Sequence, residues 1–486
     1  AVTAHLSTDV AAAPFLWVVP LSLFLVTFIV TFQRSPVIPH GSMLRLQPVA
    51  VALPALSAAG AFGLDWAGGL VLHLAGFFVA AMVCHGELVR RRPAAVHLTE
   101  FYLWMSAGGV LGGIFAGLIA PAVFTTVAEY PLLLLASLFC RPGIFERENR
   151  GRTLREGGLI LGIVALALIP KLVFGYAPEK SGLAPAVMLA AITVGLLFLQ
   201  REHSHRLAAI LAGSVALLAV YQDYLRPPFS LRSFFGVHKV LVSPDGQFRV
   251  LAHGTTIHGA QRLKNADGTP VAGPPEPLTY YFTEGGIAEA LLATRAARGG
   301  RLGHVGIVGV GTGSMACHSR AGEAWTYYDI DPDVVRIARD PRLFSFLPVC
   351  APDPTVILGD ARLTLADRPD ATYDVLIIDA FSSDAIPVHL MTREAVALYA
   401  SKLAPGGILV MHISNRNMEL AGVVGAVAAA EGLAAIVNTP VKTPEHVEQM
   451  KVPPHVAVIA RSSEDLAAVA ARPGWKPLAG GAVRPW

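Results

Sequence analysis

Apolar and polar positions divide the chain at about residue 222. Before that point, long apolar stretches recur with short polar loops between them, and each is near the length that crosses the hydrocarbon core of a bilayer. The stretches lie at 11–32, 47–64, 66–84, 101–120, 122–140, 157–174, 184–199 and 207–221. We therefore expect a multi-span α-helical membrane domain over residues 1–222, with about eight spans.

After residue 222 the pattern changes to short strands and then to strands that alternate with helices. SLRSFFGVHKVLVSP, FRVLAHGTTIHGAQ and LTYYFTEGG predict strands joined by glycine turns in a small β-rich region, residues 223–290. Further strands are predicted at 304–308, 325–330, 355–358, 373–379, 407–414, 434–437 and 455–461. Because helical segments separate them, we expect an α/β doubly wound, mostly parallel, Rossmann-like domain over residues 291–486.

Composition supports this division. The chain is 53% hydrophobic and 15% charged, whereas charged residues make up about a quarter of a typical soluble protein. The net charge of +3 is too small to indicate nucleic acid as a partner. The apolar stretches make the lipid bilayer the expected partner. The four cysteines are far apart and form no CxxC pair, which indicates neither a zinc site nor a disulfide framework. We therefore expect no bound metal. We expect Cys317 to be a small residue that packs in the protein interior.

A glycine-rich turn follows the first strand of the predicted sheet. Its glycines let the backbone approach a ligand closely; they are Gly309, Gly311 and Gly313. Asp329 comes about twenty residues after the first glycine, at the end of the second strand, where an acid accepts hydrogen bonds from ribose hydroxyls. Asp360 follows the third strand and Asp379 ends the fourth. Since ligands of such sheets bind at the carboxyl ends of the strands, we expect an adenosine-containing ligand there.

At these residues the chain resembles the spermidine synthase family, the aminopropyltransferases. That family has an S-adenosylmethionine methyltransferase-like Rossmann fold preceded by a small β-domain, and the resemblance covers residues 230–461. CHGEL and HLTEFYLWMSAGGVLGG resemble the membrane part of bacterial membrane-fused spermidine synthase-like proteins. The resemblance implies that the adenosyl group is held by Gly309, Gly311, Thr312, Gly313, Asp329, Ile330, Asp360 and Ala361.

DAFSSDAIP resembles the D-S-S-D-P-type loop of the family, which implies catalytic roles for Asp379 and Asp384. The tyrosine-rich segment of the family is represented by Tyr280 and Tyr281, and HGTTIHGAQ replaces its glutamine-containing stretch, so His258 and Gln261 become substrate candidates. Thr312 stands where the family has an aspartate that holds the amine of the transferred group. S-adenosylmethionine and its decarboxylated form are therefore both kept as the co-substrate. His412, after the fifth strand, could face the same cleft.

The resemblance implies a membrane-bound transferase that moves an aminopropyl or aminocarboxypropyl group to a small-molecule amine and releases methylthioadenosine. Without an acceptor, the donor's own carboxylate or amine could attack, which would make the protein a lyase or cyclase. Two other functions stay open: a transporter or sensor with a nucleotide-binding domain, and a methyltransferase acting on a membrane substrate. A homodimer is also kept open.

Basic residues give a test of topology. They gather in alternate loops between the apolar stretches, and the positive-inside rule puts those loops in the cytoplasm. With eight spans, the domain after residue 222 would lie outside the cell. One missed or re-entrant segment would reverse this result. A nucleotide-type ligand is made in the cytosol, which favours a cytoplasmic domain. We therefore expect a multi-pass protein of the bacterial inner membrane whose soluble domain is cytoplasmic.

Overall fold

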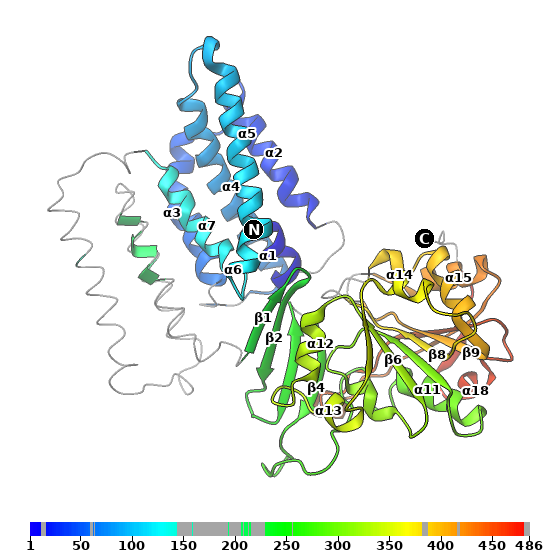
Figure 1. The fold of residues 1–486 in the computed structure, drawn as a ribbon. Coiled ribbons are helices and arrows are strands. Elements are labelled where there is room, and N and C mark those ends of the chain that lie inside the picture. The colour runs from blue at the N-terminus through cyan, green and yellow to red at the C-terminus, as the bar shows by residue number, and fades with distance from the viewer. Residues whose placement is uncertain are drawn as a thin grey trace. The chain divides into compact units, whose positions relative to one another are not determined.

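The computed structural model describes two compact units, Ala1–Arg226 and Pro227–Trp486. Apart from a few isolated positions, the described residues are 1–10, 16–58, 64–142, 229–254, 256–381, 387–415 and 418–480. Figure 1 draws both units. Each unit is described below by itself.

The first unit is helical in its described part (Figure 1). Its helices are α1 (Val2–His5), α2 (Val18–Phe32), α3 (His40–Ala58), α4 (Trp66–Arg90), α5 (Leu98–Ile114), α6 (Ala120–Val123) and α7 (Glu129–Ser137). Short helical turns, η3 (Phe115–Ile119) and η4 (Leu138–Cys140), extend α5 and α7. The apolar faces of α3, α4 and α7 share one buried cluster, which holds these helices together.

A glycine allows one close helix contact in this unit. A Cβ atom on Gly76 of α4 would lie 2.4 Å from the carbonyl oxygen of Ala50 in α3, so only glycine allows this approach. The glycine-rich stretch SAGGVLGGIFAG of α5 and η3 makes no such contact in the described part of the chain. Nothing there lies within 4 Å of a Cβ placed on any of its five glycines.

Two helical stretches, Trp66–Arg90 and Ala95–Val123, are long and apolar enough to cross a membrane. In the most apolar part of Trp66–Arg90, 44% of the residues are buried inside the protein. In the corresponding part of Ala95–Val123, only 6% are buried. The second stretch therefore presents its apolar side chains outward. Most of the residues in the three predicted spans at 157–174, 184–199 and 207–221 fall outside the described residues, so the count of eight stays a prediction.

The second unit begins with an antiparallel sheet in the order β1-β2-β3-β4. Its strands are β1 (Phe229–Ser233), β2 (Gly236–Val242), β3 (Phe248–His253) and β4 (Thr256–Arg262). The third predicted strand, LTYYFTEGG, is wrong. This segment is a turn because Thr279 has φ +54° and the amide of Tyr281 donates to the carbonyl of Leu278. The turn leads directly into α11 (Gly286–Ala297), which crosses the predicted boundary at residue 290.

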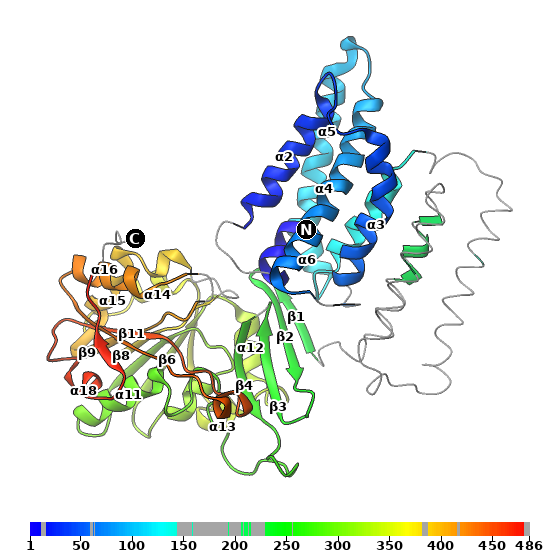
Figure 2. The ribbon, with the colours of Figure 1, turned by 180° about the vertical axis from the view of Figure 1, so that it is seen from behind.

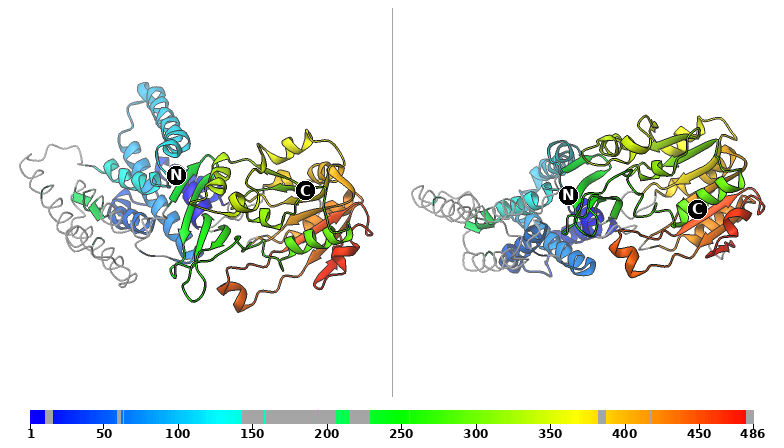
Figure 3. Two further views of the ribbon diagram at one scale, coloured as in Figure 1. Left: turned by 60° about the horizontal axis from the view of Figure 1, so that its bottom comes forward. Right: turned by 90° about the horizontal axis from the view of Figure 1, so that it is seen from below.

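The doubly wound sheet is confirmed, and the predicted strands agree with the observed ones to within a few residues. Its order is β12-β10-β11-β9-β8-β5-β6-β7. The strands are β5 (His304–Val308), β6 (Ala324–Asp329), β7 (Thr355–Leu358), β8 (Tyr373–Ile378), β9 (Leu403–His412), β10 (Ala434–Asn438), β11 (Val456–Ala460) and β12 (Trp475–Pro477). β9, β8, β5, β6 and β7 are parallel, and β10, β11 and β12 pair antiparallel. Figures 2 and 3 show this sheet from further sides.

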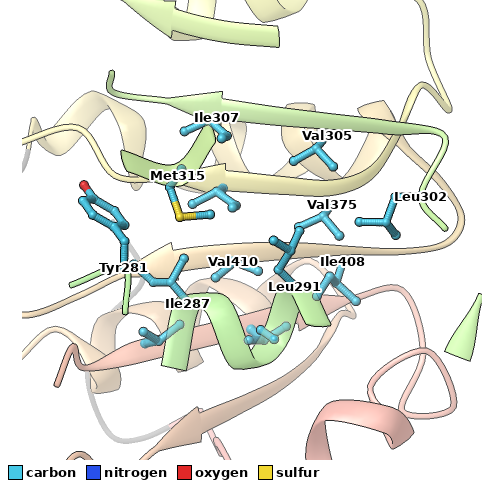
Figure 4. Packing of buried hydrophobic residues seen from close by; sticks show 14 of the residues in the cluster. Tyr281, Ile287, Leu291, Leu302, Val305, Ile307, Met315, Val375, Ile408 and Val410 are labelled. Atoms are coloured by element: carbon cyan, nitrogen blue, oxygen red, sulfur yellow. The ribbon is translucent and has the colours of Figure 1, made fainter. Parts of the chain in front are cut away.

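Helices cover both faces of the main sheet. α11 and α18 (Ala467–Ala470) lie on one face, and α14 (Ala361–Ala366), α15 (Arg393–Lys402) and α16 (Ala421–Ala430) lie on the other. On the first face, Ile287 and Leu291 of α11 pack against valines and isoleucines of β5, β8 and β9 (Figure 4). Each fully buried aliphatic side chain contributes about 1.5–3 kcal/mol, so these two layers fix the strands whose ends carry the polar residues.

A disulfide joins Cys317 to Cys350, with Cα atoms 4.9 Å apart. The expectations of no disulfide and of a simple packing role for Cys317 are therefore wrong. The two cysteines lie 33 residues apart in the chain, and only the fold brings together the ends of η7 (Ser314–His318) and α13 (Phe346–Cys350). The bond thus ties the segment after the glycine turn to the segment before β7.

We expect Cys317→Ser and Cys350→Ser each to lower the free energy of unfolding by about 2–4 kcal/mol, because the bond closes a loop in the unfolded chain. Thermal unfolding of the detergent-solubilised chain with and without dithiothreitol measures this: the native protein and the control below should respond to the reductant, and the two variants should not. Cys140→Ser, at an exposed free cysteine, is the control. Two free thiols at 317 and 350 in mass spectrometry without reductant would contradict the bond.

Candidate active site

The main sheet has a topological switch between β5 and β8. From β5 the chain proceeds to β6 and β7 on one side and then returns to β8 on the other side of β5. Ligands of doubly wound sheets bind at the carboxyl ends of the strands at such a point. A cavity of about 300 Å³ lies there, and its walls include residues that follow β5, β6, β7 and β8 together with histidines of β2, β3 and β4.

The glycine turn forms the floor of this cavity. Gly309 has φ +99°, and a Cβ atom on it would lie 2.2 Å from the carbonyl oxygen of Asp379. Gly311 has φ +54°, and its Cβ would lie 2.9 Å from the carbonyl oxygen of His258. Since L-residues rarely adopt these dihedral angles, glycine is needed at both positions, for backbone conformation and for space.

Asp329 is fixed by backbone amides around it. Its Oδ2 accepts a hydrogen bond from the amide of Val310 at 2.8 Å, and its Oδ1 accepts one from the amide of Asp331 at 2.9 Å. Burial nevertheless raises the pKa of Asp329 above its ordinary value, since the amides offset only part of the cost of desolvating the charge. The carboxylate lines the cavity directly beside the glycine turn.

Three carboxylates around the cavity are each paired with a histidine. His238 Nε2 lies 2.8 Å from Asp331 Oδ2, His389 Nε2 lies 2.9 Å from Asp360 Oδ2, and His412 Nδ1 lies 2.6 Å from Asp379 Oδ1. Asp360 also caps α14 by accepting from the amides of Arg362 and Leu363. These contacts orient the acids toward the cavity, where they could hold a cationic or hydroxyl-bearing ligand.

Asp379 has a donor on each oxygen. The hydroxyl of Tyr281 donates to Oδ2, opposite the imidazole on Oδ1. Burial would raise the pKa of Asp379, but attraction to His412 and the hydrogen bonds from His412 and Tyr281 hold that pKa below its ordinary value. Burial and the Asp379 charge together raise the pKa of Tyr281 well above its ordinary value. The site therefore holds a buried carboxylate beside a neutral phenol.

Most of the predicted site residues line the cavity: Gly309, Gly311, Asp329, Ile330, Asp360, Ala361, Asp379, Tyr281 and His258. Others lie elsewhere. Thr312 is fully buried and packs under Gly259 of β4, while Gln261 bonds to the hydroxyl and amide of Ser345. Gly313 caps η7, the ring of Tyr280 lies against His412, and Asp384 falls outside the described residues. The roles assigned to all these residues stay predictions.

Sequence reasoning did not select His238, His389 or Asp331 for the site. Asp331 follows β6 two residues after Asp329 and is visible in the sequence as a second strand-end acid. His238 lies within β2 and His389 within a short helical turn, Val388–Leu390. Nothing local distinguishes these two histidines, because each becomes part of the site only through its partner on the sheet.

Among the described residues, no group of three or more His, Cys, Asp or Glu side chains is arranged to hold a metal ion.

No family model matches the chain. Over 111 residues it is 36% identical to the polyamine aminopropyltransferase of Vibrio vulnificus. This alignment covers 21% of the chain and 35% of that protein, so the match spans about a third of the length of its curated relative. Part of the chain is therefore similar in sequence to an aminopropyltransferase.

Solved structures give further likenesses. A probable spermidine synthase from Corynebacterium glutamicum matches 53% of the chain and 95% of its own length, with 16% identity and a TM-score of 0.39. The spermidine synthase of Thermotoga maritima matches 50% of the chain and 75% of its own length, with 13% identity and a TM-score of 0.36.

We expect Gly309→Ala to abolish ligand binding and to destabilise the protein. The positive φ costs about 1–2 kcal/mol for an L-residue, and the clash with the Asp379 carbonyl adds about 1–3 kcal/mol. Gly300→Ala is the matched control, because Gly300 has φ +91° but nothing within 4 Å of its Cβ. Thermal unfolding and calorimetric titration with S-adenosylmethionine measure both effects. Equal losses in the two variants would contradict a specific role for the close approach.

Proposed function

We propose that the protein is an alkyl transferase that takes an adenosyl sulfonium donor and moves an aminopropyl-type group to a small amine. The observation that carries this proposal is the ionised, buried Asp379 with Tyr281 on one oxygen, at the end of a cavity built on a glycine turn. The partial sequence similarity to an aminopropyltransferase supports the same reaction class.

The residues of the cavity suit a cationic donor. Four carboxylates line it, from Asp329, Asp331, Asp360 and Asp379, and their field favours a sulfonium. In the proposed orientation, Asp329 accepts from the ribose hydroxyls and Asp360 lies at the adenine end, as the resemblance implies. The carbon to be transferred then lies near Asp379, at the opposite end of the cavity.

The transfer is a single displacement. The acceptor amine forms a bond to the carbon next to sulfur, the C–S bond breaks, and its electron pair stays on methylthioadenosine, which leaves neutral. Asp379 accepts the proton that the amine loses. Tyr281 holds the second carboxylate oxygen in place, so much of the rate comes from alignment of the amine with the C–S bond.

His258 bears on which donor is used. It lines the cavity beside Gly311, and the position that carries an aspartate in the family is the buried Thr312. A carboxylate at this end of the donor would meet an imidazole instead of an acid, which favours intact S-adenosylmethionine. The decarboxylated donor remains the alternative that the assay below compares directly.

We also propose that the first unit anchors the enzyme in a membrane. The support is the pair of long apolar helical stretches, Trp66–Arg90 and Ala95–Val123, of which the second exposes large apolar side chains such as Trp104, Leu111 and Leu118.

Asp379→Asn should lower the rate of methylthioadenosine release at least about a hundred-fold, because the amide cannot accept the amine's proton, and should leave donor binding measurable. The assay supplies each donor with and without a diamine and separates products by chromatography. Asp267→Asn, at an exposed turn of the β-rich region, is the control. S-adenosylhomocysteine as the product would indicate a methyltransferase, and binding without any product would indicate a sensor; either result would overturn the proposal.

The full chain should stay in the membrane pellet after washing with alkaline carbonate, because its apolar helices cannot leave the hydrocarbon core without a large cost. A truncated chain that lacks residues 64–142 should bind the membrane less tightly than the full chain. Release of the full chain by carbonate would contradict membrane insertion.

A further inference from the structure

His412 is fixed beside Asp379 by the register of the main sheet. β8 and β9 are parallel neighbours, and Ile378 pairs with Met411. The next residue of each strand end is Asp379 and His412, so the two side chains emerge next to each other. The imidazole Nδ1 lies 2.6 Å from Asp379 Oδ1, and the two side chains are only 4% and 6% exposed.

Asp379 and Ser414 hold the two nitrogens of the His412 ring. The carboxylate of Asp379 can only accept, so Nδ1 bears a hydrogen and donates it to Oδ1. Ser414 Oγ lies 2.8 Å from His412 Nε2, and the backbone amide of His455 donates to the same Oγ at 2.8 Å. Ser414 thus fixes the orientation of the ring. The Nδ1–H then points at the carboxylate and stabilises its negative charge.

Two aromatic rings enclose the imidazole. The rings of Tyr280 and Phe381 each lie with their centroids 4.9 Å from that of His412. They limit the access of water, which strengthens the hydrogen bond to Asp379. Among the described residues, the titratable groups that favour the ionised form of Asp379 are His412, Tyr281 and His258. Of these, His412 contributes the most.

We propose that His412, held by Ser414, is a positioning residue that keeps Asp379 ionised and aimed into the cavity. This inference rests on the proposed function, in which Asp379 accepts the proton of the attacking amine. A carboxyl that is already protonated cannot do so. Each carboxylate oxygen has a second acceptor site, so Asp379 can still receive the amine's N–H while His412 and Tyr281 hold it.

The test compares His412→Leu, which removes both ring nitrogens, with His412→Asn, whose amide N–H can take the place of Nδ1–H. In the leucine variant the acidic limb of the pH profile of kcat/KM should move to higher pH by about one unit, a roughly ten-fold loss on the acidic side. The asparagine variant should recover most of that shift. Ser414→Ala should shift the limb in the same direction by less, because the ring then loses the contact that fixes its orientation toward Asp379.

His304→Gln is the matched control. His304 begins β5, at the amino ends of the strands and away from the cavity, and bonds to Thr326 at 2.8 Å, so its loss should leave the limb in place. Folding of the variants is judged by circular dichroism. An acidic limb that is unchanged in His412→Leu, or, if that variant does not fold, unchanged in Ser414→Ala, would overturn the role of His412.

Calorimetric titration with S-adenosylmethionine across pH separates this inference from the proposed function. Binding of the sulfonium should weaken as Asp379 becomes protonated, and the midpoint of that loss should move to higher pH in His412→Leu. A shifted midpoint without any methylthioadenosine release would support the positioning role of His412 and contradict the proposed transferase function. An unshifted midpoint in a protein that releases methylthioadenosine would contradict the role of His412 and support the transferase function.

Discussion

The close approach of two backbone segments, at Gly309 and Asp379, is the constraint on which the site depends. The two residues follow β5 and β8, the parallel neighbouring strands at which the order of strand addition reverses. A Cβ atom at 309 would lie 2.2 Å from the Asp379 carbonyl, so any side chain there would push β5 and β8 apart. Because there is no side chain, the turn lies flat on the strand ends and leaves the cavity open above it. Asp329, Asp360 and Asp379 therefore all line this one cavity.

Collecting carboxylates in a half-buried cavity has an electrostatic cost. Like charges and burial both favour protonation, and Asp329 is held with a raised pKa even though two amides donate to it. The structure offsets this cost at Asp331 and Asp379 with one histidine each. The pKa of Asp331 lies below its ordinary value because the hydrogen bonds from His238 and Ser233 outweigh burial. Imidazole pairing therefore keeps these two acids ionised, and no lysine or arginine is among the described residues that line the cavity.

The main features of the second unit could be predicted from sequence, because a parallel sheet is encoded locally. β5 to β8 are each an apolar run that ends at a glycine or an acid, and β5 to β9 lie close to where the sequence pattern puts them. The features that sequence missed depend on partners far along the chain. His238 and Asp331 are 93 residues apart, and Cys317 and Cys350 are 33 apart. LTYYFTEGG was misassigned because its aromatic residues favour a strand, whereas the positive φ of Thr279 turns the chain and points Tyr281 at Asp379.

The disulfide links the chemistry of the site to the side of the membrane on which it lies. Cys317 lies four residues after Gly313, and Leu347, from the helix that ends at Cys350, packs against that glycine. The bond thus braces the turn that forms the cavity floor. Disulfides persist in oxidising compartments. The predicted eight spans, with the positive-inside rule, would also put this unit outside the cell, whereas the cytosolic origin of the proposed donor favours the cytoplasm. In a reducing cytoplasm the same pair would be two thiols and the turn would lose its brace. Outside the cell the brace would persist, and the proposed donor would have to cross the membrane to reach the turn.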